Sequence, residues 1–349
     1  MPAAQAYGQA IFSALRTHFG NNIPETIIEP GRGMVGNAGV IKSEVVLISR
    51  KSDNDNVRWV YLDIGKFGGL AETMDEAIRY PIVTAHDGGE VAPCVLAGPT
   101  CDSADVMYEK TPYPLPLSRK FGCVPAMAID VLRRAKALGL DAYGVSFHVG
   151  SQQTDLSAWD RALGDARRVF ATLAEEGIVL KMVNMGGGFP TRYLKDVPAA
   201  QAYGRAIFSA LRKHFGNDLP ETIIEPGRGM VGNAGVIKSE VVLISKKADN
   251  DNVRWVYLDI GKFGGLAETM DEAIRYPIVT ARDGDQVAPC VLAGPTCDSA
   301  DVLYEKTPYP LPLSLTIGDE VLIEGTGAYT TTYASVAFNG FEPLRSYVI

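Results

Sequence analysis

The segment IIEPGRGMVGNAG occurs twice in the chain, at residues 27–39 and, letter for letter, at residues 223–235. It joins a β-branched run to a Glu-Pro-Gly-Arg sequence and a glycine-rich turn, which is typical of a strand that ends at a binding site. The repeat extends to both sides, because residues 2–118 align with residues 198–314 without a gap and differ at only ten positions. Solenoid repeats are far shorter. The chain therefore contains a partial copy of a domain-sized segment.

The ends of the repeat indicate a rearranged chain. The first copy begins inside a helical pattern and stops after PLPLS, at Ser118. The second copy continues from Ser314 through LTIGDEVLIEGTGAYTTTY. We therefore expect residues 1–118 to lack the last strands of the domain that the second copy completes.

Composition excludes several classes of protein. The 349 residues are 46% hydrophobic, which is enough for more than one packed domain. A net charge of −8 argues against a nucleic-acid partner and is compatible with a cationic substrate. The start has no signal-peptide pattern, and no apolar run reaches membrane-spanning length. Five cysteines without a CxxC pair indicate reduced thiols and a cytoplasmic protein.

Residues 124–225 alternate between helical and strand patterns, which predicts parallel βαβ units. The expected strands are DAYGVSFHVG, read as buried, IVLKMVNM and ETIIEP, and AAQAYGRAIFSALRKHFG is expected to be a helix. Two further helices have an apolar face at helical spacing. The predicted faces are Ala128, Val131, Leu132, Ala135 and Leu138 in the first, and Trp159, Leu163, Ala166, Phe170 and Leu173 in the second.

Beyond Val236 short strands separated by turns predict a mostly antiparallel β domain. The fold class is thus α/β plus β: a partial (β/α)₈-type barrel segment, an antiparallel β domain and a partial amino-terminal duplicate. We expect the duplicated end of the barrel segment at residues 1–40 and the duplicated, incomplete β domain at residues 41–118. The barrel segment is expected at residues 119–235 and the complete β domain at residues 236–349.

Three predicted strands end in FHVGSQQ, NMGGGFP and IEPGRG. In parallel βα architectures, chemistry lies on the loops at the carboxyl ends of strands. The glycines would let backbone N–H groups approach an anion, and Arg228 could grip the same phosphate or form a loop salt bridge. Glu225 at a strand end needs a cationic partner. His148 could lie flat on an aromatic cofactor or be an ordinary buried histidine.

The order of these motifs, followed by GPTCDSAD and GAYTTTYASVAFNGF, resembles the ornithine/lysine decarboxylases of the alanine-racemase-like, pyridoxal-phosphate class. The resemblance covers residues 119–349 and is closest to the bacterial enzymes. It implies a (β/α)₈ barrel with a β domain, a homodimer with active sites between the subunits, and pyridoxal 5'-phosphate as cofactor. It also implies decarboxylation of a basic amino acid, L-ornithine to putrescine.

The resemblance also implies a role for each matching residue. His148 would stack on the pyridine ring, and Glu225 would pair with its nitrogen. Asp259 and Asp298 would bind the distal ammonium of the substrate, and Cys297 would act in the partner's site. The phosphate would be held by Ser151, Gly186, Gly187, Gly188, Gly227, Arg228 and Tyr329, and Pro226 would also belong to the cofactor-binding residues. The duplicate repeats five of these positions as Glu29, Arg32, Asp63, Cys101 and Asp102.

One family feature has no counterpart in the chain. The family holds the cofactor as a Schiff base to a lysine in a run resembling AVKAN, and none of the 14 lysines has such a context. Lys66 and Lys262, both in DIGKFGG, are poor substitutes. We expect about four of eight barrel strands, counting Thr26–Glu29 in the duplicate, which stands where the amino-terminal half of the barrel is expected.

These observations leave several functions open. The chain is a lyase by lineage with impaired activity, a non-catalytic homologue that binds partners, or a rearranged chain without a stable fold. Within enzymes, the alternative is diaminopimelate decarboxylase, although Asp298 suits a lone distal ammonium better than a distal carboxylate. Ornithine and lysine differ by one methylene, which is worth only about 1–3 kcal/mol of discrimination.

Overall fold

The computed structural model describes residues 3–49, 57–76, 78–84, 94–100, 102, 104–108 and 122–349. The chain divides into two compact units, Met1–Val45 and Val46–Ile349. Each unit is described by itself.

The first unit consists of the helices α1 (Ala4–Phe19) and α2 (Gly31–Val35) and the chain that joins them. Neither helix has a buried residue. The strand predicted at Thr26–Glu29 does not form: these residues are exposed and belong to no sheet. That prediction was wrong because an extended segment becomes a strand only where a neighbouring strand accepts its backbone hydrogen bonds.

The duplicated β region forms a small sheet with the strand order β1-β2-β3-β4. Its elements are β1 (Val45–Ser49), β2 (Arg58–Leu62), the 3₁₀ turns η1 (Lys66–Gly68) and η2 (Ala71–Glu76), β3 (Cys94–Ala97) and β4 (Val106–Tyr108). The core consists of Trp59, Tyr61, Val95, Ala97 and Val106. As expected for a truncated copy, residues 82–84 form no strand, whereas the same residues of the second copy do.

The βα segment alternates helices and strands as predicted. In chain order it contains α3 (Pro125–Ala137), β5 (Gly144–Ser146), α4 (Ser157–Glu175), β6 (Met182–Asn184), α5 (Ala200–Phe215) and β7 (Glu221–Ile223). The strands form one parallel sheet in the order β5-β6-β7. The described residues therefore contain three strands of this barrel type, rather than the four or so expected.

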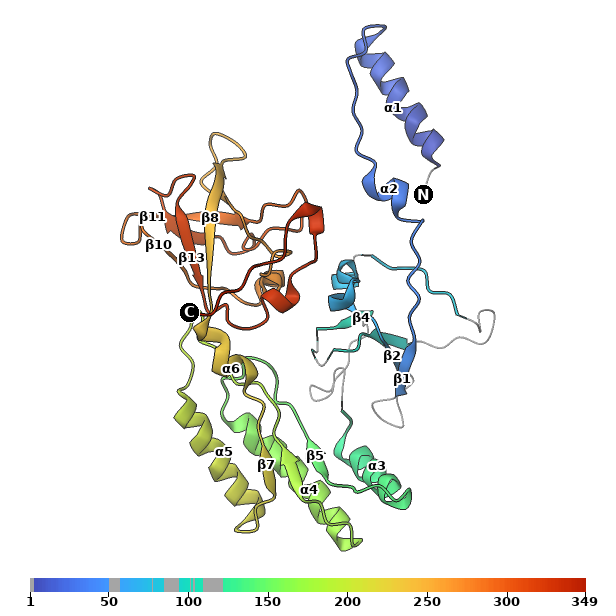
Figure 1. Ribbon diagram of the computed structural model, residues 1–349, viewed down its shortest axis with the longest axis vertical. Coiled ribbons are helices and arrows are strands. Elements are labelled where there is room, and N and C mark those ends of the chain that lie inside the picture. Colours follow the sequence, from blue (N-terminus) through green and yellow to red (C-terminus); the bar gives the residue numbers. More distant parts are fainter. Residues whose placement is uncertain are drawn as a thin grey trace. The chain divides into compact units, whose positions relative to one another are not determined.

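A single apolar core holds this segment together, and α4 and α5 pack against each other within it (Figure 1). The predicted inner face of α4 is confirmed, because Trp159, Leu163 and Leu173 are fully buried. The ring of Tyr203 in α5 meets the edge of Trp159 at 5.5 Å between centroids. Fully burying each large apolar side chain stabilises the fold by about 1.5–3 kcal/mol.

The predicted burial is wrong at one side of this segment. Val131 in α3 and Leu138, directly after α3, are 57% and 60% exposed, and Val145 in β5 is only half-buried. The physical reason is the small number of strands. β5 is at the edge of a three-stranded sheet, and in the part of the chain that the structure describes no further strand or helix covers α3 and β5 fully.

The carboxyl-terminal β domain begins with a short helix, α6 (Gly227–Val231), and a turn, η3 (Gly232–Ala234). Its six-stranded sheet has the order β10-β13-β8-β9-β11-β12 and is antiparallel except between β9 and β11, as predicted. The elements are β8 (Val236–Ser245), β9 (Arg254–Leu258), η4 (Ala267–Glu272), β10 (Ile278–Thr280), β11 (Val287–Ala293), β12 (Tyr309–Pro312), β13 (Glu320–Glu324), η5 (Thr331–Tyr333) and η6 (Phe338–Gly340).

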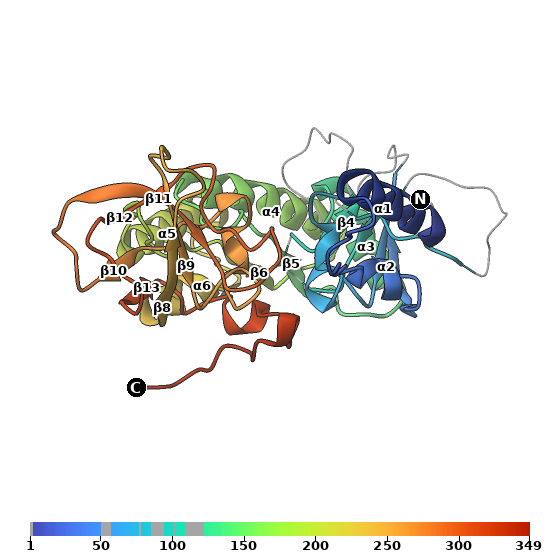
Figure 2. The ribbon, with the colours of Figure 1, turned by 90° about the horizontal axis from the view of Figure 1, so that it is seen from above.

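Among the described residues, this domain has the largest core, with 17 buried apolar residues against five in the described part of the duplicated sheet. Figure 2 shows its strands gathered together and the terminal residues running away from them. Val348 and Ile349 are fully exposed there. Within the described part of the chain, no helix is both long and apolar enough to cross a membrane.

Candidate functional site

The turns that follow β5, β6 and β7 meet at one place. His148 follows β5, the three glycines follow β6, and Glu225 follows β7. Gly187 lies between the other two turns: a Cβ atom added to it would be 3.0 Å from the carbonyl oxygen of Glu225 and 3.3 Å from Nε2 of His148. Three residues predicted from separate motifs are thus in direct proximity.

The glycines are required by both conformation and space. Gly186 and Gly188 have φ values of 62° and 100°, in the left-handed region. A side chain at Gly186 would come within 2.1 Å of the Phe147 carbonyl oxygen, and one at Gly188 within 2.5 Å of the Gly150 carbonyl oxygen. Among the described residues, the N–H groups of Gly187 and Gly188 have no hydrogen-bond partner. Two backbone donors are therefore available at this turn.

Asn184 connects two of the turns, and the sequence analysis missed it. Its Oδ1 accepts a hydrogen bond from the Gly186 N–H at 2.9 Å, and its Nδ2 donates to Oε1 of Glu225 at 2.7 Å. The amide thus orients the Glu225 carboxylate, which is otherwise exposed. The available signal was a polar side chain at the last position of a strand, two residues before the first glycine of the run.

The His148 turn is fixed by its own backbone. Nδ1 of His148 accepts a hydrogen bond from the Gly150 N–H at 2.9 Å, which requires that nitrogen to be unprotonated. Nε2 faces Gly187. The ring is exposed rather than buried, so the alternative of an ordinary buried histidine does not hold. Ser151 follows on the same turn and is also exposed.

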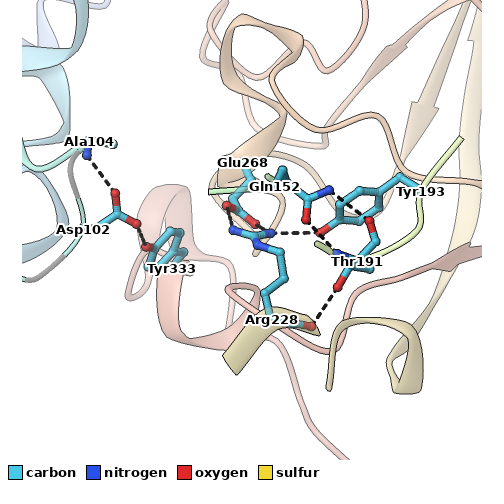
Figure 3. Close-up of polar contacts among 8 residues, drawn as sticks. All are labelled: Asp102, Ala104, Gln152, Thr191, Tyr193, Arg228, Glu268 and Tyr333. Carbon is cyan, nitrogen blue, oxygen red and sulfur yellow. Dashed lines mark hydrogen bonds and ion pairs between the residues drawn. The ribbon is translucent and has the colours of Figure 1, made fainter. Parts of the chain in front are cut away.

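A second set of bonds joins this turn to α6 (Figure 3). Gln152 pairs twice with the backbone of Thr191, donating to its carbonyl at 2.9 Å and accepting from its N–H at 2.7 Å. The Thr191 hydroxyl then donates to the Arg228 carbonyl at 2.8 Å. These bonds fix the start of α6, where Pro226 and Gly227 precede Arg228.

Arg228 is held in a salt bridge to the β domain (Figure 3). Its NH1 and NH2 donate to the two carboxylate oxygens of Glu268 at 2.6 and 2.5 Å, and NH1 also donates to the Tyr193 hydroxyl at 2.9 Å. The guanidinium carbon lies 4.5 Å from the centre of the Tyr329 ring. Burial alone would lower the pKa of Arg228, but the hydrogen bonds and charge of Glu268 outweigh it and raise the pKa.

The duplicate contacts the same neighbourhood. The Tyr333 hydroxyl donates to Oδ2 of Asp102 at 2.6 Å (Figure 3). The Tyr333 ring also stacks on Phe67, with the ring centroids 4.5 Å apart. Tyr333 is also 5.3 Å from Tyr329, between ring centroids. Burial and the Asp102 carboxylate raise the pKa of Tyr333. Cys101, the predicted companion of Asp102, lies outside the described residues.

Other predicted site residues lie elsewhere. Asp259 accepts hydrogen bonds from the Ser239 hydroxyl and the Glu240 N–H, and it lines a hollow of the β domain with Phe263 and Thr296. None of the residues predicted to hold the phosphate lines that hollow. Asp298 accepts from the Ala300 N–H.

The remaining predicted residues have varied surroundings. Cys297 is exposed and accepts a hydrogen bond from the Asn339 amide at 3.3 Å. Glu29 and Arg32 are exposed in the first unit, and Asp63 is exposed after β2. Lys262 is half-buried, and burial lowers its pKa. The described residues contain no cluster of histidine, cysteine and carboxylate groups that could hold a metal ion.

Two families match the chain. One is described as "Pyridoxal-dependent decarboxylase, pyridoxal binding domain" and matches residues 110–232. The other is described as "Pyridoxal-dependent decarboxylase, C-terminal sheet domain" and matches residues 17–122. In this chain the match to the sheet domain therefore precedes the match to the binding domain.

Curated relatives are similar over part of their length. The lysine/ornithine decarboxylase of Selenomonas ruminantium is 36% identical over 78% of this chain and 67% of that protein. The ornithine decarboxylase of Cricetulus griseus is 33% identical over 67% of this chain and 53% of that protein. Antizyme inhibitor 2 of Xenopus laevis is 35% identical over 65% and 51%. The chain thus spans between about half and two thirds of these relatives.

Solved structures have the same fold. The lysine/ornithine decarboxylase from Vibrio vulnificus, complexed with cadaverine, has a TM-score of 0.59 at 33% identity and covers 65% of this chain and 60% of that one. The Selenomonas ruminantium lysine decarboxylase in complex with PLP and cadaverine has a TM-score of 0.58 at 31% identity, over 72% and 60%.

Proposed function

We propose, since the chain belongs to the family of pyridoxal-dependent ornithine/lysine decarboxylases, that it binds pyridoxal 5'-phosphate without a covalent bond at the turns after β5, β6 and β7. Its substrates are then basic amino acids, with L-ornithine, which would yield putrescine, ahead of lysine. Turnover is strongly impaired, because no lysine is present in the expected context.

The observation that carries this proposal is the convergence on Gly187. The His148 ring and the Glu225 carbonyl oxygen would be in tight contact with a Cβ atom at Gly187, and among the described residues two backbone N–H donors at this turn are unpaired. Asn184 joins the Glu225 carboxylate to the Gly186 N–H beside them. Such a set suits a flat ring that carries an anionic group, since the donors favour the anion and the carboxylate favours a protonated ring nitrogen. The residues present therefore fit the cofactor.

Each side chain would have one task. His148 would lie against the ring, and Glu225, oriented by Asn184, would keep a proton on the ring nitrogen. The N–H groups of Gly187 and Gly188 and the Arg228 guanidinium would hold the phosphate. When bound, pyridoxal phosphate supplies an electron sink for the charge left on the amino acid by loss of CO₂.

The duplicate is the proposed source of a contact that a second subunit makes elsewhere in the family. Asp102 reaches Tyr333, next to the Tyr329 ring that stacks on Arg228. Asp102 would then take, within one chain, the role assigned to Asp298, which is to attract the distal ammonium of the substrate. A carboxylate suits a lone ammonium and disfavours the distal carboxylate of diaminopimelate.

A second candidate is a homologue that binds without catalysis. It is favoured by the absent lysine and by the similarity to a relative named for inhibiting antizyme rather than for decarboxylation. The two candidates differ in one measurable respect, which is release of CO₂ from ornithine by the protein with bound cofactor.

The direct test is to titrate purified protein with pyridoxal phosphate, reduce it with borohydride and map the modified peptides. We expect saturable binding and no single stoichiometrically labelled lysine. CO₂ release from ornithine should be several orders of magnitude slower than an ordinary enzymatic rate, because removing one member of a catalytic set commonly has an effect of that order. One labelled lysine together with an ordinary rate would contradict this. Lys262 would be the first candidate, because its lowered pKa favours the reactive neutral amine.

Self-association is also proposed. Among the described strands, β5 and β7 are the edges of the three-stranded parallel sheet and pair with no further strand. Such edges recruit further chains. Light scattering should report species larger than one chain at micromolar concentration. A clean monomer over that range would count against the proposal.

A further inference from the structure

Arg228 has more hydrogen-bond donors than its partners use. A guanidinium carries five N–H groups in one plane. Two NH1 hydrogens are directed at Tyr193 and Glu268, and one NH2 hydrogen is directed at Glu268. The Nε hydrogen and the second NH2 hydrogen remain, and they have no partner among the described residues. These two donors point from the same edge of the guanidinium, which is a geometry that binds phosphate in a bidentate manner.

The orientation of this free edge is set by three contacts. Glu268 and Tyr193 hold the opposite end of the guanidinium, and the Tyr329 ring lies against its face at 4.5 Å. The Arg228 side chain is only 10% exposed, and the Glu268 side chain 15%. The Nε atom of Arg228 is not fully enclosed, so an anion can reach this edge of the guanidinium from solvent and bind both donors.

The two members of the salt bridge come from different parts of the fold. Arg228 belongs to α6, next to the βα segment, and Glu268 belongs to η4 of the β domain. The βα segment alone therefore does not fix the phosphate-facing edge of Arg228.

We propose that Glu268 is a positioning residue for the phosphate of the cofactor: it holds Arg228 so that the Nε–NH2 edge faces the phosphate. This inference rests on the proposed function. It extends that function by assigning a role to Glu268, which would touch neither the cofactor ring nor the substrate. The negative charge of Glu268 also balances the positive charge of the largely buried Arg228 guanidinium when no phosphate is bound.

The chain supplies its own matched control. Residues 70–81 repeat the sequence of residues 266–277 letter for letter, so Glu72 is the counterpart of Glu268. Glu72 accepts a hydrogen bond from the Tyr80 hydroxyl at 3.4 Å. The substitutions Glu268→Gln and Glu72→Gln thus make the same chemical change in the same local sequence.

The experiment compares binding of pyridoxal phosphate and of pyridoxal, which lacks the phosphate, to the full chain by equilibrium dialysis. Loss of one charge-assisted hydrogen bond predicts that Glu268→Gln weakens pyridoxal phosphate binding on the order of tenfold or more. Pyridoxal binding should be unchanged within about twofold, since it makes no phosphate contact. Glu72→Gln should change neither. Tyr193→Phe, which removes only the third contact of Arg228, should give a smaller loss of the same kind.

The outcomes separate this inference from the proposed function. If wild-type protein prefers pyridoxal phosphate to pyridoxal but Glu268→Gln keeps that preference, or weakens both ligands equally, Glu268 does not position Arg228. Tighter binding of pyridoxal phosphate by Glu268→Gln would mean that the carboxylate competes with the phosphate, which also overturns the inference. If wild-type protein shows no preference for the phosphate, the proposed cofactor site fails together with the role of Glu268.

Discussion

The helices α1 and α5 have 16 residues each and differ at two positions, yet only one of them is packed. Tyr203 and Ile207 of α5 are 4% and 6% exposed, whereas their counterparts Tyr7 and Ile11 are 52% and 40% exposed. Both segments are helical, so helix formation follows local sequence. Burial does not, because α5 lies on α4 and α1 has no such partner within its unit.

The two copies of the β region differ less. In both, the turn after the RWVYL strand is held by a buried aspartate: the Lys66 N–H donates to Asp105 and the Lys262 N–H donates to Asp301, each at 2.7 Å. What differs is the extent of the core, which in the second copy also includes Leu315, Val321 and Ile323, beyond the end of the repeat at Ser314. Contacts between residues that both copies contain are thus reproduced. The extent of the packing depends also on sequence that only one copy has.

The largest difference between the copies is expected for two cysteines. Cys94 is exposed, whereas Cys290 is buried and burial raises its pKa to about 12. Near pH 8 only about 10⁻⁴ of the Cys290 thiol would then be ionised, and the thiolate is the species that reacts. Alkylation followed by peptide mass spectrometry should therefore show Cys94 modified at least about 100-fold faster. Equal rates would mean that the second sheet does not exclude water from Cys290.

The next difference concerns stability. Ile207→Ala should lower the free energy of unfolding by about 2–4 kcal/mol, because it leaves a cavity in the core beneath α5. Ile11→Ala removes the same atoms from an exposed position and should cost less than about 1 kcal/mol. Urea denaturation of both variants measures the pair. A comparable loss from Ile11→Ala would show that α1 is packed against a partner in solution.

The smallest difference concerns the two CDSAD loops. Asp102 and Asp298 each accept a hydrogen bond from the N–H group two residues on, at 2.8 Å. Only Asp102 also accepts one from Tyr333. Asp102→Asn should therefore cost about 1 kcal/mol of stability, and Asp298→Asn close to nothing. If the two substitutions cost the same, the contact between the duplicate and Tyr333 does not form.

Much of the site could be predicted from the sequence. Strand–helix alternation placed the motifs of His148, Gly187 and Glu225 at the ends of neighbouring parallel strands, and such ends share one edge of a sheet. The structure brings these three residues together. The inner face of α4 was also predictable, since helical periodicity identifies the side that meets a core.

Other features depended on contacts that sequence patterns do not encode. Thr26–Glu29 has the same letters as part of the β7 region but forms no strand, because pairing needs a neighbour. Val131 is exposed because the sheet ends at β5. Glu268 was missed since its partner Arg228 is 40 residues away and belongs to another part of the fold.

The most direct test of the central claim, that the anion site forms only in the second copy, is the pair Arg228→Lys and Arg32→Lys. Each substitution keeps the charge and removes the planar fork from the same EPGRG sequence. In pyridoxal phosphate binding, the account predicts a loss on the order of tenfold or more for Arg228→Lys and no change for Arg32→Lys. Equal losses from the two substitutions, or no loss from Arg228→Lys, would contradict it.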